Sequence, residues 1–153
     1  MQIKRWSLLS VLLVLLSFSG GCATYVAHVA PGIDASQPHR FFVVRNLDDN
    51  HRIDVMIVDA LKAEGKEAEY GPLTMVPSKV DAVIGYRDHW SWDFTDHLVT
   101  LSMEMRDPVT GNGLASATYV SPTSLRTPAE SVVYKLVGEM LHQKGRPLPK
   151  KAK

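Results

Sequence analysis

The clearest pattern along the chain is an alternation of apolar and polar side chains between residues 80 and 106. Apolar side chains recur at every second position from Val80 to Phe94, with Asp88 as the exception, and again from Val99 to Met105. A period of two predicts strands with one covered face. Asp107–Gly113 is rich in turn residues, and residues 114–120 can form a return strand. The pattern predicts an antiparallel meander.

Apolar positions at steps of three and four predict two helices. The first covers residues 49–63, with Asn46, Asp48 and Asp49 as N-cap candidates at its start and Gly65 as a suitable C-cap at its end. The second covers about residues 128–143, and Thr127 with Glu130 has the spacing of a capping box at its start. Short strands are predicted at residues 41–44 and 67–70.

These elements predict an α+β fold: a two-layer sandwich with a mostly antiparallel sheet of about four to five strands and two helices on one face. We expect the folded domain to span residues 39–144. Residues 22–38 carry turn chemistry and are predicted to form a tether, and residues 145–153 a basic flexible tail.

The N-terminal segment has the layout of a secretory signal peptide. Lys4 and Arg5 precede a mostly apolar run, residues 6–18, that is short for a membrane span, and small residues follow. Residues 1–21 are therefore predicted to be a signal peptide. The segment Ser19-Gly20-Gly21-Cys22 resembles the lipobox of bacterial lipoproteins, although an aliphatic residue is usual in place of Ser19.

This resemblance implies that Cys22 is acylated, so the first expected partner is a membrane held through an N-terminal lipid. By the sorting rule of enteric-type bacteria, Ala23 after the cysteine implies the periplasmic face of the outer membrane. Several acyl chains hold a protein far more firmly than one.

Composition excludes some functions. The formal net charge of +1 gives no electrostatic basis for nucleic-acid binding. A single cysteine excludes an intrachain disulfide and a multi-cysteine metal site.

The aromatic row of Trp90, Trp92 and Phe94 has two interpretations. It is either core beneath a helix or a binding surface that overhangs the sheet. The nearby His89, Asp93, Asp96 and His97 have side chains that suit zinc, but no metal signature is present, and we interpret them as a solvated strand face beside a turn. Ser91 with His89 and Asp93 has the residue types of a hydrolase triad, but strand neighbours point side by side.

The chain also resembles small Gram-negative envelope lipoproteins whose domains have no assigned function. The resemblance lies in the lipobox, the helix end at residues 60–65, the strand at 80–86, the hairpin at 106–111 and the final helix. It implies no catalytic residues.

The sequence as a whole favours a non-enzymatic binding or accessory module of the cell envelope, without a cofactor and with an envelope protein as a further, unidentified partner. Two alternatives stay open. One is a metal-dependent envelope hydrolase that uses His89, Asp93, Asp96 and His97. The other is a carrier of apolar ligands with Trp90, Trp92 and Phe94 lining a groove.

Overall fold

The computed structural model describes residues 23–122 and 126–143. The predicted signal peptide, Cys22 and the basic tail therefore lie outside the described residues. The described elements, in chain order, are β1 (Thr24–Val29), β2 (Arg40–Val44), α2 (Ile53–Ala63), β3 (Glu67–Gly71), the short 3₁₀ helix η1 (Leu73–Met75), β4 (Ala82–Trp92), β5 (Asp96–Arg106), β6 (Gly113–Val120) and α3 (Ala129–His142).

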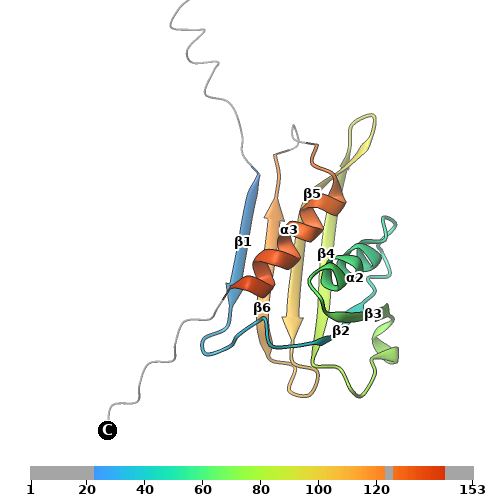
Figure 1. The fold of residues 1–153 in the computed structure, drawn as a ribbon. Coiled ribbons are helices and arrows are strands. Elements are labelled where there is room, and N and C mark those ends of the chain that lie inside the picture. Colours follow the sequence, from blue (N-terminus) through green and yellow to red (C-terminus); the bar gives the residue numbers. More distant parts are fainter. Residues whose placement is uncertain (1–22, 123–125, 144–153) are drawn as a thin grey trace, which may run out of the picture.

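The architecture is a six-stranded sheet with both helices on one face (Figure 1). The strand order is β1-β6-β5-β4-β2-β3. The prediction of an α+β sandwich with two helices is confirmed, but the predicted four to five strands of a mostly antiparallel sheet are corrected to six strands of a mixed sheet. β2 pairs in parallel with both β3 and β4. The reason is that α2 carries the chain back across the sheet between β2 and β3, so both strands run in the same direction.

The predicted tether differs from the structure at residues 24–29, which form edge strand β1. Thr24 lies opposite Val120 and Val29 opposite Ala115 in an antiparallel ladder with β6. The Tyr25 ring contacts that of Tyr119, with centroids 4.9 Å apart, and the Lys135 ammonium of α3 lies over Tyr25. Side-chain packing as well as backbone pairing thus holds this segment in the sheet.

The meander is as predicted, with two register irregularities, one between β4 and β5 and one between β5 and β6 at Met105 and Arg106. β4 is a single long strand, and its register with β5 shifts between His89 and Trp90. His89 pairs with Thr100 and Trp90 with Leu98, so Val99 is the extra residue of a bulge in β5. Because of this bulge, Leu98 and Leu101 are both fully buried although they lie three residues apart.

The first helix begins later than predicted but ends as predicted. Asp49 lies outside α2, and its carboxylate accepts a hydrogen bond from the backbone N–H of Ile53 at 2.7 Å. At the C-terminal end, Gly65 has φ of 75°, and the N–H groups of Gly65 and Lys66 donate to Lys62 and Leu61. This is a Schellman ending, which favours glycine.

The second helix confirms the predicted range to within one residue at each end, but not the predicted cap. Its N-cap is Pro128, and no side chain caps it, so the capping box of Thr127 and Glu130 does not form. Val132, Leu136 and Met140 face the sheet and are fully buried.

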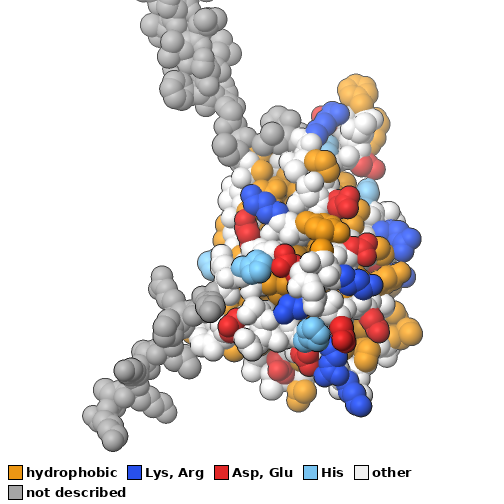
Figure 2. Space-filling view, viewed as in Figure 1, with side chains coloured by type: hydrophobic (Ala, Val, Ile, Leu, Met, Phe, Trp, Pro, Cys, Tyr) orange, Lys and Arg blue, Asp and Glu red, His pale blue; other side chains and the backbone are white. Residues whose placement is uncertain are grey.

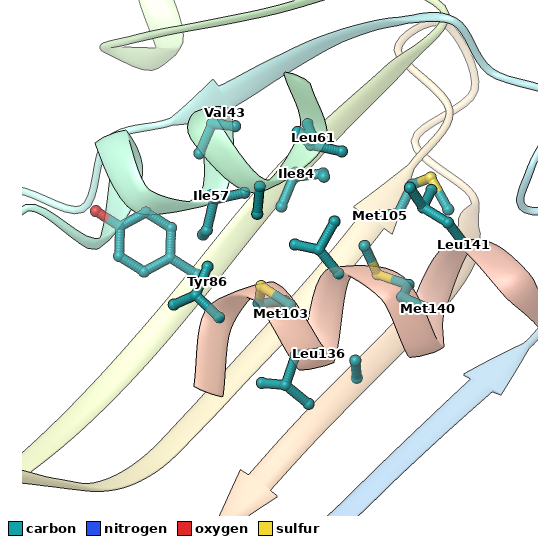
Figure 3. Close-up of a cluster of buried hydrophobic side chains, with 14 of the residues drawn as sticks. Val43, Ile57, Leu61, Ile84, Tyr86, Met103, Met105, Leu136, Met140 and Leu141 are labelled. Carbon is teal, nitrogen blue, oxygen red and sulfur yellow. The ribbon is translucent and has the colours of Figure 1, made fainter. Parts of the chain in front are cut away.

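The hydrophobic core lies between the helices and the sheet (Figure 3). It joins the apolar stripes of both helices to the alternate positions of the strands. The labelled members are Val43, Ile57, Leu61, Ile84, Tyr86, Met103, Met105, Leu136, Met140 and Leu141. Within residues 23–122 and 126–143, no helix covers the opposite face of the sheet (Figure 1).

Candidate functional site

The β4–β5 hairpin projects beyond the helices (Figure 1), and its tip carries exposed aromatic side chains. We define the aromatic tip as Trp92 and Phe94, whose side chains are 70% and 90% exposed. Their ring centroids lie 6.1 Å apart. Hydrophobic side chains are visible at this end of the molecule in the space-filling view (Figure 2). The interpretation of Trp92 and Phe94 as core beneath a helix is therefore wrong. Both side chains belong to an exposed surface that overhangs the sheet.

The backbone of the tip is unusual. Trp92 pairs with Asp96, so residues 93–95 form the connection, and Phe94 at its centre has φ of 62°. A non-glycine residue in this left-handed region costs about 1–2 kcal/mol, and glycine is the usual occupant. Folding by itself does not favour phenylalanine here. The position keeps a large apolar side chain in water at a cost in stability.

Arg126, which precedes α3, braces the tip from another part of the chain. Its guanidinium donates to the side-chain and backbone oxygens of Asp93 at 2.5 and 3.1 Å and to the Thr95 hydroxyl at 3.1 Å. These contacts hold both residues that flank Phe94. They also neutralise the Asp93 carboxylate through an ion pair.

Trp90 belongs to the same strand face but has a different environment. Its ring stacks on the His51 imidazole, with centroids 3.7 Å apart and planes at 14°. Its indole N–H donates to the Asp88 carboxylate at 2.8 Å. Trp90 is therefore part of the folded body, and the predicted three-residue stripe is divided between Trp90 and the aromatic tip.

The four predicted metal-ligand candidates are not gathered into one site. Asp93 is paired with Arg126, and the Asp96 carboxylate faces the His51 ring at 3.5 Å. His97 is buried, with Nδ1 3.4 Å from the Thr95 carbonyl, whereas His89 is exposed. The carboxylate of Asp93, the acid of the possible Ser91–His89–Asp93 triad, accepts a hydrogen bond from Arg126 and is not available to orient His89.

The sequence analysis missed a different polar cluster, formed by Asp49, His51 and Asp88. Their potential ligand atoms lie within 4.8 Å of one another. The Asp49 carboxylate accepts hydrogen bonds from the Tyr86 hydroxyl and from the backbone N–H of His51, each at 2.7 Å. The signal was present as a polar run at residues 46–51, which we read only for helix caps.

Hydrogen bonds within the protein already occupy this cluster. Asp88 accepts from Trp90 and, at 3.4 Å, from the Asn46 side chain. Burial tends to raise the pKa of Asp49, but donation from Tyr86 and the backbone N–H groups outweighs it, so the pKa of Asp49 lies below its usual value. Burial, together with donation to Asp49, raises the pKa of the Tyr86 hydroxyl. These hydrogen bonds connect the loop before α2 to strand β4 and give the cluster a structural role.

The predicted apolar groove is not found at the aromatic stripe. A hollow of about 610 Å³ lies elsewhere, over the helix-free face of the sheet. Polar side chains make up much of its lining, including Arg87, Ser102, Glu104 and Thr118. The aromatic tip stands in the open and does not line this hollow.

In the described part of the chain, no helix has the length and apolar character needed to cross a bilayer.

Comparison with known proteins supports the fold. No protein-family model matches the chain, and no curated protein shows significant sequence similarity to it. Among solved structures, the PelC dodecamer from Paraburkholderia phytofirmans matches with a TM-score of 0.54 and 16% identity, over 78% of this chain and 95% of the other. Its L103M variant matches with a TM-score of 0.53 and 17% identity over the same shares. At these identities the similarity shows a common fold.

Proposed function

We propose that this protein is a lipid-anchored, non-enzymatic accessory module of the cell envelope, which binds through the aromatic tip. The single observation that carries the proposal is the exposure of Trp92 and Phe94 on a braced hairpin. Large exposed apolar side chains, held rigidly, are typical of interaction surfaces.

The anchor rests on the N-terminal sequence. Lys4 and Arg5, the apolar run at 6–18 and the lipobox-like segment ending at Cys22 support export and acylation. Ala23 supports the outer membrane as the destination by the sorting rule. The non-enzymatic role is supported by the way the candidate catalytic and metal-binding side chains are engaged. Asp93 is held by Arg126, and Asp88 by Trp90 and Asn46.

The experiment is to express the full chain in a Gram-negative host with radiolabelled palmitate. We expect label on the wild type and none on Cys22→Ala, with the wild type in the outer-membrane fraction. Ser19→Leu, which completes the usual lipobox, is the matched control and should label at least as strongly. Membrane association of Cys22→Ala equal to that of the wild type, without label on either, would refute the anchor.

A second variant tests the destination separately from the lipid. We expect Ala23→Asp to be labelled as fully as the wild type but to move to the inner-membrane fraction. Labelled Ala23→Asp that stays with the wild type in the outer membrane contradicts the sorting step and leaves acylation standing.

A further inference from the structure

The start of β1, which follows the expected acylation site by two residues in the sequence, and the aromatic tip lie at the same end of the sheet. The strand registers place Thr24, Val120, Thr100 and His89 in one row across β1, β6, β5 and β4. β1 begins at this end, and the β4–β5 hairpin projects beyond it (Figure 1).

The tip reaches at least as far from this row as the lipid attachment point does. Trp92 follows His89 by three residues of strand β4, a rise of about 10 Å. Cys22 precedes Thr24 by two residues, a reach of at most about 7 Å. A membrane that holds the lipid of Cys22 therefore meets the aromatic tip before any other part of the sheet.

The side chains at the tip suit the boundary between water and lipid. Tryptophan is enriched at membrane interfaces because its ring is apolar and its N–H is polar, and phenylalanine supplies apolar area. The adjacent Asp93 is neutralised by Arg126, which removes one repulsion from anionic headgroups. The other acid at the tip, Asp96, faces the imidazole of His51.

We propose that Trp92 and Phe94 insert into the interfacial layer of the membrane that anchors Cys22, as a second contact that fixes the orientation of the domain. The inference rests on the proposed function, because the acyl chains bring the tip to the surface. One lipid attachment leaves a domain free to tilt, whereas a second contact at the tip of β4 aligns the strands with the membrane normal.

Depth-dependent quenching tests this contact. The acylated protein from the full chain is reconstituted into vesicles of phosphatidylethanolamine and phosphatidylglycerol with brominated acyl chains, which quench tryptophan by contact. The emission of Trp92 is taken as the difference between the wild type and Trp92→Phe, so that the emission of Trp90 cancels; Trp6 belongs to the predicted signal peptide, which is removed on acylation. We expect roughly half or more of this emission to be quenched, as for an interfacial tryptophan.

The opposite turn supplies a matched control. Val109 is 90% exposed at the far end of the same meander. Trp92→Phe combined with Val109→Trp places an equally exposed tryptophan there, and we expect no quenching. Phe94→Gly, which suits the left-handed backbone, should keep the fold and reduce the quenching of Trp92.

Each outcome decides between explanations. Trp92 emission that is blue-shifted but unquenched would show a second copy or another protein on the tip and would overturn the membrane contact. Emission unchanged from water would overturn it as well. In both cases, flotation and palmitate label leave the anchor standing. Protein that carries no lipid and does not float with vesicles refutes the anchor and this proposal together.

Discussion

The two turns of the β4–β5–β6 meander are built in opposite ways. In the β5–β6 turn, the Asp107 carboxylate accepts from the N–H groups of Val109 and Thr110 and from the Thr110 hydroxyl, and glycine occupies the left-handed position, Gly111, at φ of 71°. In the β4–β5 turn, phenylalanine takes the left-handed position, and the support comes from Arg126, more than thirty residues away.

The difference indicates that the β5–β6 turn is optimised for folding, whereas the β4–β5 turn is optimised to expose an aromatic side chain. Local hydrogen bonds and a glycine make the β5–β6 turn self-sufficient. The β4–β5 turn departs from local preference at one position, Phe94, and that position holds the most exposed aromatic ring at the tip. A departure from local rules is expected where a function opposes stability.

The largest expected effect is a difference in stability loss between substitutions at the buried base of the β4–β5 hairpin and at its exposed tip. Leu98→Ala removes a fully buried side chain and should lower the free energy of unfolding by about 2–5 kcal/mol. Trp92→Ala, on the exposed tip, should change it by no more than about 0.5 kcal/mol. Urea unfolding measures both, and equal losses would show that the tip is part of the core.

The β5–β6 turn should suffer from losing its glycine. Gly111→Ala should lower the free energy of unfolding by about 1–2 kcal/mol through backbone strain alone, since nothing lies within 4 Å of the added Cβ. The matched control is Gly85→Ala, where the space is also open and the backbone is that of a strand. An equal effect of both substitutions in thermal unfolding would contradict the role of the left-handed backbone.

The β4–β5 turn should gain from the opposite substitution. Phe94→Gly relieves the left-handed strain of about 1–2 kcal/mol but adds about 0.5–1 kcal/mol of glycine entropy, so we expect a net gain of about 0.5–1 kcal/mol. Chemical denaturation checks this. A clear loss of stability would mean that the Phe94 ring packs on the fold, and the contrast between the two turns would fail.

The smallest effect is a pH dependence confined to the β5–β6 turn. Donation from the Thr110 N–H, the Thr110 hydroxyl and the Val109 N–H lowers the pKa of Asp107 below its usual 3.8. Ionised Asp107 therefore stabilises the turn above about pH 3.8, and this contribution is lost as the pH falls through the lower pKa of the folded state.

Melting temperatures of the wild type and Asp107→Asn measure this effect. The difference between them should be largest near pH 7 and shrink below the usual pKa of an aspartate, about pH 3.9. Asp59→Asn, at an exposed position on α2, is the control and should show no such pH-dependent difference. A gap for Asp107→Asn that persists at low pH contradicts the ionic origin.

The helices and the strands of the meander were predictable because each buries one face and exposes the other. The stripes of α2 and α3 and the alternation in β4, β5 and β6 record burial directly in the sequence. The parallel pairing of β2 was not predictable, because a period of two shows which side chains face inward and not which strand lies alongside. β1 was missed although Tyr25, Ala27 and Val29 alternate, because turn residues dominate the rest of the segment up to residue 38.

The site was predictable only in part. The period placed Trp90 and Trp92 on one face, but it gives no information on how far the helices extend over that face. The stacking of Trp90 on His51 and the support of Asp93 by Arg126 join residues far apart in the sequence. Nothing local in either segment records these contacts. For the same reason, Asp49 and Asp88 were assigned separately, one as a helix cap and one as an interruption of a strand.

The pairing of β1 with β6 has a consequence for the order in which the molecule is made. Residues 24–29 are synthesised early, but their partners at residues 115–120 follow 86 to 96 positions later in the chain. Closing so long a loop is entropically costly, and contacts of this kind form slowly. We therefore expect β1 to be the last strand to join the sheet, so that its unpaired backbone groups are open to aggregation until β6 has been synthesised and has folded.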